Sequence, residues 1–308
     1  EALSTEDAHG NNVAIGYQSL KTQNAGANAG NTSVGYQSGL DLTTGHSATL
    51  IGALSGANLT TGNENTALGY NALASETTGG KNTALGFNTL TALNRTSDGY
   101  NTAVGWDAGK SISDGAENTI LGGEAADALT VGNSNVAIGN QALSADQNGS
   151  RNVAIGATAL KVQEASGSTS NNVYNIGIGF GAGIAVTTSH SNTIVGSNAM
   201  NSASSGCNYN TVVGIEAANN MTTTSEYNTC IGGYAGDNMT DNARNNVYLG
   251  YNTQTNSAND DYQIVIGTDM NGVGPYYITM GNNSNGRIYN QFTANANWTR
   301  TSDERIKK

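Results

Sequence analysis

Charge, aromatic side chains, proline and cysteine are all scarce in this sequence. Only 11% of its 308 residues are charged and 6% are aromatic, and it contains one proline and two cysteines. Two cysteines in separate repeats argue against a disulfide framework. No apolar run reaches the length of a membrane-spanning helix, so we expect no membrane insertion. Acidic residues outnumber basic ones by 23 to 12, which argues against a nucleic-acid partner.

Hydrophobic residues are also few, at 37%, but they recur too regularly for a disordered chain. Residues 65–73 read NTALGYNAL, and residues 82–90 read NTALGFNTL. Registered on its glycine, this unit occurs 15 times at spacings of 17 to 19, with one spacing of 23. Such a period indicates a solenoid, in which each unit buries its apolar side by stacking on the next. The repeat glycines are Gly16, Gly35, Gly52, Gly69, Gly86, Gly105, Gly122, Gly139, Gly156, Gly179, Gly196, Gly214, Gly232, Gly250 and Gly267.

The residue before the repeat glycine is a branched aliphatic in every copy. A valine, threonine, isoleucine or alanine stands two residues earlier, so both lie on one face of a strand. We predict that this aliphatic column is the core, and that the small residue between the two positions, usually alanine, contacts sister chains. The representative core positions are Ile15, Leu68, Leu85, Val104, Ile138 and Ile155.

The residue four before the repeat glycine is asparagine in 13 of 15 copies. Asparagine is a poor strand former, so its recurrence indicates a positional demand. In a parallel stack, amides about 4.8 Å apart can form a hydrogen-bonded ladder. The alternative is a row of polar ligands for a sugar or an ion. The predicted ladder contains Asn65, Asn82, Asn101, Asn118, Asn135 and Asn152.

Each unit therefore predicts a short strand, a bend, a second short segment and a turn rich in threonine, glycine and asparagine. The predicted fold is an all-β parallel solenoid of about 15 coils of 17–19 residues, forming a rod about 70 Å long at one strand spacing per coil. We expect a lead-in at 1–11, the solenoid at 12–270, a capping or neck region at 271–299 and a junction at 300–308.

Departures from the repeat are the predicted places of contact, because insertions in a solenoid map to one edge. The turn around 161–175 is enlarged, and we name Gln163, Glu164 and the aromatic Trp106 as receptor-contact candidates. A tolerated surface insertion is the alternative. The three histidines lie in turns, so we expect no metal, the alternative being a metal-binding ring of one histidine on a three-fold axis. We also expect no cofactor. No carboxylate pair is identifiable by spacing, which makes a polysaccharide depolymerase the least favoured function.

Two stretches resemble known families. The repeated Asn-Thr/Val-Ala-Ile-Gly unit resembles the head repeats of YadA-type trimeric adhesins, which implies left-handed parallel β-rolls with three chains side by side. The residues from Ser302 to Lys307 resemble the start of the self-cleaving intramolecular chaperone domain that ends many phage tail fibres and tailspikes. That second resemblance implies a cleavage dyad of Ser302 and Lys307, since a lysine whose pKa is lowered by burial can activate a serine hydroxyl.

These resemblances favour a structural and receptor-binding segment of a homotrimeric phage tail fibre, located in the virion tail. Its expected partners are two sister chains, a host-surface glycan or protein, and other tail proteins joined through a preceding segment. The alternative is the head of a trimeric adhesin on a bacterial surface. The self-cleavage junction is the only enzymatic activity that the resemblance implies.

Overall fold

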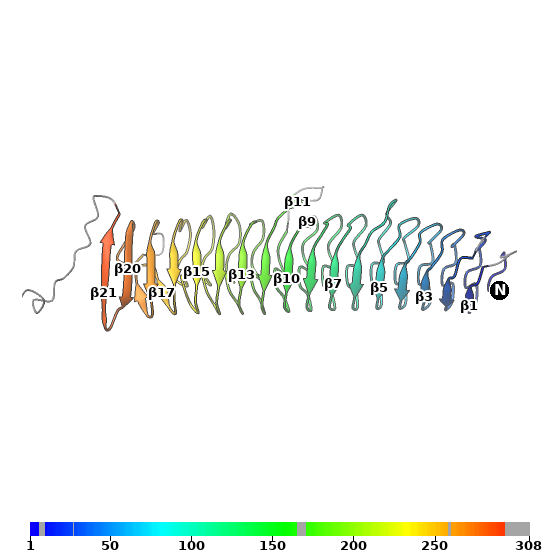
Figure 1. Ribbon diagram of the computed structural model, residues 1–308, viewed down its shortest axis with the longest axis horizontal. Coiled ribbons are helices and arrows are strands. Elements are labelled where there is room, and N and C mark those ends of the chain that lie inside the picture. The colour runs from blue at the N-terminus through cyan, green and yellow to red at the C-terminus, as the bar shows by residue number, and fades with distance from the viewer. Residues whose placement is uncertain (6–9, 27, 165–170, 258–259, 293–308) are drawn as a thin grey trace, which may run out of the picture.

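The computed structural model describes residues 1–5, 10–26, 28–164, 171–257 and 260–292 as a straight rod of stacked coils (Figure 1). All regular structure in these residues is β-strand, and none is helix. One strand of each coil joins a single sheet of 17 strands that runs the length of the rod. The fold is therefore the all-β parallel solenoid that the repeat predicts.

Successive coils pair in parallel, residue against the corresponding residue of the next copy. Thr66 lies opposite Thr83, and Leu68 lies opposite Leu85. The strands that form this parallel stack are β1 (Val13–Ile15), β2 (Thr32–Val34), β3 (Thr49–Ile51), β4 (Thr66–Leu68), β5 (Thr83–Leu85), β6 (Thr102–Val104), β7 (Thr119–Leu121), β8 (Val136–Ile138), β10 (Val153–Ile155), β12 (Ile176–Ile178), β13 (Thr193–Val195), β14 (Thr211–Val213), β15 (Thr229–Ile231), β16 (Val247–Leu249), β18 (Ile264–Gly267) and β20 (Tyr277–Asn282).

The remaining strands lie in the turns and at the end of the rod. β9 (Gly149–Ser150) pairs with β11 (Asn171–Asn172), and β17 (Thr253–Gln254) pairs with β19 (Met270–Asn271). The last strand, β21 (Gly286–Gln291), runs antiparallel to β20 and ends the described stack. The hairpin of β20 and β21 therefore covers the edge that the last parallel coil would otherwise expose.

Each strand ends at the repeat glycine, where the chain bends around the corner of the coil. Gly69 has a φ of +139°, and a Cβ placed there would lie 2.2 Å from the carbonyl oxygen of Gly86 in the next coil. The corner thus requires a backbone conformation that other residues rarely adopt, and it also requires close backbone approach. Both demands recur at every coil, which explains why the column is invariant along the chain.

The interior is a narrow row of small and large side chains that compensate each other. In the coil of β3, Leu50 is the buried strand residue, and Gly56 faces it from the opposite side, where a Cβ would lie 2.8 Å from Leu50 Cδ2. In the next coil, the strand residue is Ala67, and Leu73 stands at the position of Gly56. In other coils both positions are small, and large side chains of the neighbouring coils reach into the space, as close packing demands.

The predicted orientation of the strand residues was wrong. Ile15, Leu68 and Leu85 are 59%, 42% and 39% exposed, and Val104, Ile138 and Ile155 are also only partly buried. The middle residue of each strand faces inward instead, so the alanines expected to contact sister chains are buried within their own coil. The physical reason is size: a coil of 17 residues encloses little volume, so the strand position that faces the interior is often alanine.

The asparagines four before the repeat glycine form a buried ladder along the rod. Asn118 donates from Nδ2 to Asn101 Oδ1 at 3.1 Å and to the carbonyl oxygen of Gly132 at 3.0 Å. Its own Oδ1 accepts from the backbone nitrogen and Nδ2 of Asn135 at 2.9 and 3.1 Å. Asn65, Asn82 and Asn152 are equally buried. Because the ladder is buried in the interior, its side chains cannot reach a ligand in solvent. This argues against the alternative of a row of ligand-binding residues.

Candidate interaction surface

The first and third residues of the stacked strands form a continuous apolar face, which we call the outer stripe. The third residue is an aliphatic in all 15 copies, and the first is threonine, valine or isoleucine. Neither position is fully buried in any coil from β1 to β18. Because the strands pair in register, each outer residue lies about 4.8 Å from its counterpart in the next coil. The outer stripe is therefore long and regular, with an aliphatic column beside a column that is threonine in nine of the 15 copies.

Aromatic side chains border the outer stripe on both sides. One column follows the repeat glycine and contains Tyr17, Tyr36, Tyr70, Phe87 and Trp106 in the first coils, all about half exposed. The other column precedes the asparagine ladder and is richest in the later coils, where it holds Tyr174, Tyr209, Tyr227, Tyr262 and Tyr276. The first column also holds Phe180 and Tyr251 in later coils, so both borders carry aromatic residues.

Trp106 and Glu164 lie at the surface, as a receptor contact requires. Trp106 is 53% exposed and follows the repeat glycine of the coil of β6. Glu164 is exposed at the start of the enlarged turn, and its backbone nitrogen donates to the carbonyl oxygen of Thr187. Unlike Tyr70 and Phe87, whose rings are stacked, Trp106 has no ring contact within the described residues.

The prediction that Gln163 contacts a receptor was wrong, because its side chain is fully buried. Gln163 Nε2 donates to Asp146 Oδ2 at 3.0 Å, and its Oε1 accepts from Asn175 Nδ2 at 2.9 Å. It occupies the inner column that holds Leu59 and Leu129 in other coils. The polar side chain is tolerated there because the buried amide and carboxylate satisfy each other.

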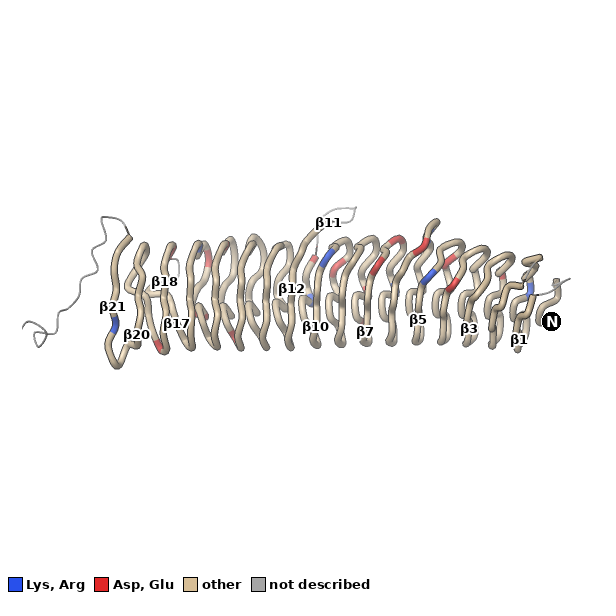
Figure 2. Tube along the Cα trace, in the orientation of Figure 1, with Lys and Arg blue, Asp and Glu red and all other residues tan. Residues whose placement is uncertain are grey.

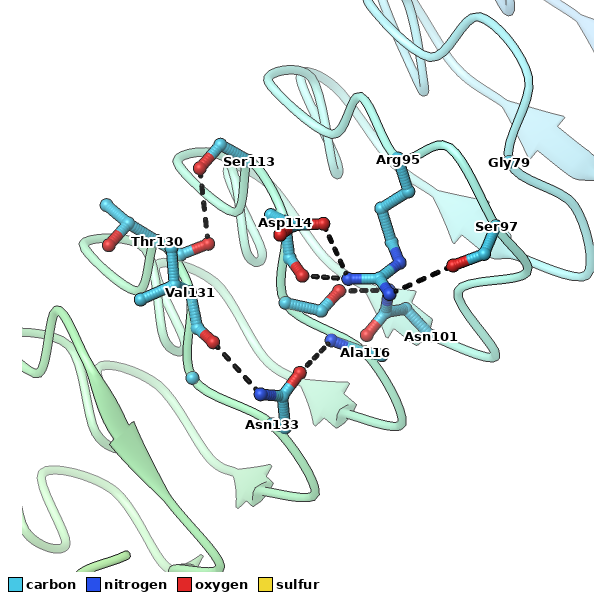
Figure 3. A network of polar contacts seen from close by, with 12 residues as sticks. Gly79, Arg95, Ser97, Asn101, Ser113, Asp114, Ala116, Thr130, Val131 and Asn133 are labelled. Atoms are coloured by element: carbon cyan, nitrogen blue, oxygen red, sulfur yellow. Dashed lines mark hydrogen bonds and ion pairs between the residues drawn. The ribbon is translucent and has the colours of Figure 1, made fainter. Parts of the chain in front are cut away.

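The smaller enlarged turn, at 91–100, is fastened to its neighbours by Arg95 (Figure 3). Arg95 Nη1 lies 2.9 Å from Asp114 Oδ1 and also donates to the backbone carbonyl of Asp114. Arg95 Nη2 donates to Ser97 Oγ at 3.3 Å, and the backbone nitrogen of Arg95 donates to the buried carboxylate of Glu76. These contacts give the inserted residues a structural role.

Many charged residues lie in the turns of the first half of the rod, outside the strands (Figure 2). Lys81 Nζ lies 2.7 Å from Asp98 Oδ2 and donates to the hydroxyl of Tyr100 at 3.1 Å. The hydrogen bond to Asp98, followed by that to Tyr100, raises the pKa of Lys81, and the same lysine lowers the pKa of Asp98. The pair is solvent-exposed, so it contributes little to stability.

A second group of charges follows the repeat glycines. Lys110 Nζ lies 3.1 Å from Asp107 Oδ2 and 3.3 Å from Asp127 Oδ2, and these carboxylates raise its pKa, Asp107 most strongly. Further along, burial and then the nearby Glu216 raise the pKa of Asp237. Asp107 and Asp127 are thus paired with a cation, whereas Asp237 and Glu216 are two neighbouring carboxylates without an ion-pair partner among the described residues.

The described residues contain no cluster of three or more histidine, cysteine or acidic side chains suited to a metal ion. They also contain no helix long and apolar enough to cross a membrane. Ser302 and Lys307, the residues of the expected cleavage dyad, lie outside the described residues. The outer stripe and its aromatic borders form an extended uncovered apolar surface in the described residues. This surface was not predicted from the sequence, because the aliphatic column was assigned to the core.

Comparisons with known protein families, curated proteins and solved structures find no match to this chain.

Proposed function

We propose that the chain is a structural and receptor-binding segment of a trimeric phage tail fibre, in which three copies associate through their outer stripes. The observation that supports this most strongly is the unbroken column of aliphatic residues along the rod, each of which is at least partly exposed. Exposed apolar surface of this extent marks an interaction site in a soluble protein. The resemblance of the repeat to trimeric adhesin heads favours three copies.

A sister chain matches the outer stripe better than an unrelated partner does. The stripe repeats every coil, at about 4.8 Å, and a second copy presents the same repeat over the same length. Burying the exposed half of one aliphatic side chain contributes about 1 kcal/mol. Repeated over 15 coils, that amount outweighs the cost of bringing the copies together.

The host receptor binds the parts of the surface that remain exposed when three copies associate through their outer stripes. These are the aromatic borders, including Trp106, and the enlarged turn that begins near Glu164. The net charge of −11 favours recognition through stacking and hydrogen bonds over recognition of an anionic polymer. The proposed receptor is accordingly a glycan or a protein on the host surface.

Light scattering coupled to size-exclusion chromatography tests the association. The proposal predicts a particle of three times 31.4 kDa, about 94 kDa. The double variant Leu68→Asp with Leu121→Asp places charges on the outer stripe and should give a folded monomer. The control Asn58→Asp with Gln147→Asp places the same charges at exposed turn positions and should leave the particle mass unchanged. A particle mass equal to that of one wild-type chain would contradict the proposal.

The resemblance at Ser302 has a separate test. In a polypeptide that continues into a chaperone domain, Ser302→Ala should abolish release of that domain, and a neighbouring Thr301→Ala should not. A reading frame that instead continues into a coiled-coil stalk and a membrane anchor would favour the adhesin alternative.

A further inference from the structure

Stacked aromatic pairs lie on both sides of a single small residue near the start of the rod. At the position after the repeat glycine, Tyr17 stacks on Tyr36 with ring centroids 5.5 Å apart, and Tyr70 stacks on Phe87 at 5.3 Å. Ala53 holds that position in the coil between the two pairs. The aromatic ladder of these five coils therefore lacks one ring, at Ala53.

The coil spacing on either side of Ala53 matches the thickness of one flat ring. Backbone hydrogen bonds from Leu54 to Tyr36 and from Asn71 to Ala53, at 2.9 and 3.0 Å, hold the three coils in register. Tyr36 and Tyr70 thus lie two coils apart, about 9.6 Å along the rod. The rings within each pair are nearly parallel, at 14° and 16°, so their faces look along the rod. A ring at the level of Ala53 would stack on both tyrosines at the spacing that the chain already uses.

Hydrogen-bond acceptors flank the same gap. The next position along the chain forms a row of amides, which Leu54 interrupts. Gln37 Nε2 donates to Gln18 Oε1 at 2.7 Å, and Asn71 Nδ2 donates to Asn88 Oδ1 at 3.1 Å. Both amides use their donors on the side away from Leu54, and no hydrogen bond to Gln37 Oε1 or Asn71 Oδ1 occurs within the described residues. The two oxygens are available to hydroxyl donors of a ligand.

We propose that the gap at Ala53 binds one pyranose ring of a host-surface glycan. The apolar faces of the sugar stack on Tyr36 and Tyr70, and its hydroxyls donate to Gln37 and Asn71. A pyranose combines two C–H faces with a rim of hydroxyls, which matches two aromatic faces with acceptors beside them. The inference rests on the proposed host contact and adds to it a ligand class and a place on the rod.

A second interruption of the aromatic ladder supplies a matched control. On the opposite border, Tyr209 stacks on Tyr227 at 5.3 Å and Tyr262 stacks on Tyr276 at 5.2 Å. Asn245 occupies the coil between these pairs and is exposed. An asparagine side chain is larger and more polar than the methyl group of Ala53, so the proposal is confined to Ala53.

Saturation-transfer NMR on the full chain tests the proposal, with the methyl glycosides of glucose, galactose, mannose, rhamnose and N-acetylglucosamine as probes and phenol as an aromatic probe. We expect saturable binding of at least one glycoside. Ala53→Tyr fills the gap and should weaken that binding at least tenfold. The variant should fold, because Tyr17, Tyr36 and Tyr70 occupy the same position in other coils. Asn245→Tyr should change the binding less than twofold.

Three outcomes would overturn the glycan site: no binding of any glycoside, binding of phenol alone, or glycoside binding that survives Ala53→Tyr. Phenol binding alone would assign the gap to an aromatic side chain of a protein partner. Light scattering on the same samples separates this result from the proposed function. A trimer that binds no glycoside removes only the site at Ala53, whereas a monomer that binds one removes the trimer and leaves the site.

Discussion

The two faces of each strand follow opposite rules. On the inner face, residue size varies from coil to coil, and Leu50 and Ala67 occupy equivalent positions. Each change is compensated across the coil, by Gly56 in one case and by Leu73 in the other. On the outer face, the aliphatic column hardly varies, yet nothing in the described part of the chain covers it. The constant residue type of the outer column indicates a surface that packs against a regular partner. The variable residue size of the inner positions indicates a core in which neighbouring side chains adjust to one another.

The largest loss of stability should come from adding a methyl group at the repeat glycine, where the coil bends. Gly69→Ala places a Cβ at a φ of +139°, 2.2 Å from a backbone oxygen of the next coil. We expect a loss of about 3–5 kcal/mol in the free energy of unfolding, measured by denaturant titration. Gly123→Ala is the control, because a Cβ there meets no atom closer than 3.4 Å, and its effect should stay within about 0.5 kcal/mol.

Exchanging the two halves of one compensating pair would test whether the coil conserves volume. Leu50→Ala leaves a cavity and should cost about 2–5 kcal/mol. Gly56→Leu overpacks the same coil and should cost about 1–3 kcal/mol. The double variant reproduces the arrangement of Ala67 and Leu73, and Leu73 already adopts the φ of +54° that resembles the +55° of Gly56. It should therefore be more stable than either single variant, and simple additivity would contradict the compensation.

Removing one amide of the buried asparagine ladder should cause a smaller loss of stability. Asn118→Ala removes the acceptor of the Asn135 backbone nitrogen and two donated hydrogen bonds. Leaving these buried groups unpaired should cost about 1–3 kcal/mol, measured by thermal or denaturant unfolding. Asn58→Ala, at an exposed turn position, should leave stability unchanged. Equal effects would mean that the amides are not held in a ladder.

The smallest expected effect comes from Asp237, whose pKa is raised mainly by burial and secondly by Glu216. The folded state therefore binds its proton more tightly than the unfolded state, and this carboxyl destabilises the fold as pH rises through its raised pKa. Asp237→Asn should be more stable than the wild type near pH 7, by less than about 1 kcal/mol. The difference should shrink toward acidic pH in thermal unfolding. A constant difference would rule out titration of Asp237 as its cause.

The sequence was sufficient to predict the solenoid, the coil length and the strand positions, because a fixed glycine and an aliphatic spacing of two leave few other folds. It could not tell which face of a three-residue strand turns inward. Ala67 and Leu68 alternate in either orientation, and only the volume enclosed by one coil decides between them. Gln163 was misplaced for a related reason, since its inner column admits a polar residue only through Asp146 and Asn175, which are distant in sequence.

The gap in the aromatic border at Ala53 could be predicted from the sequence only in part. Tyr36 and Tyr70 are 34 residues apart, and their parallel orientation depends on the stacking of each with its neighbour. The repeat register alone does place Ala53 between them, so a column-by-column reading of the position after the glycine would have found the interruption. The ring orientation required the structure.

Thiol labelling tests most directly whether the outer stripe is covered in the assembled protein. Leu68→Cys replaces a residue that is 42% exposed in the single chain, and Gln147→Cys provides an exposed control in a turn. The native Cys207 and Cys230 are buried and give a low background. If copies associate through the outer stripe, a maleimide should label Leu68→Cys at least tenfold more slowly than Gln147→Cys. Equal labelling rates would show that the aliphatic column faces solvent and would contradict the association.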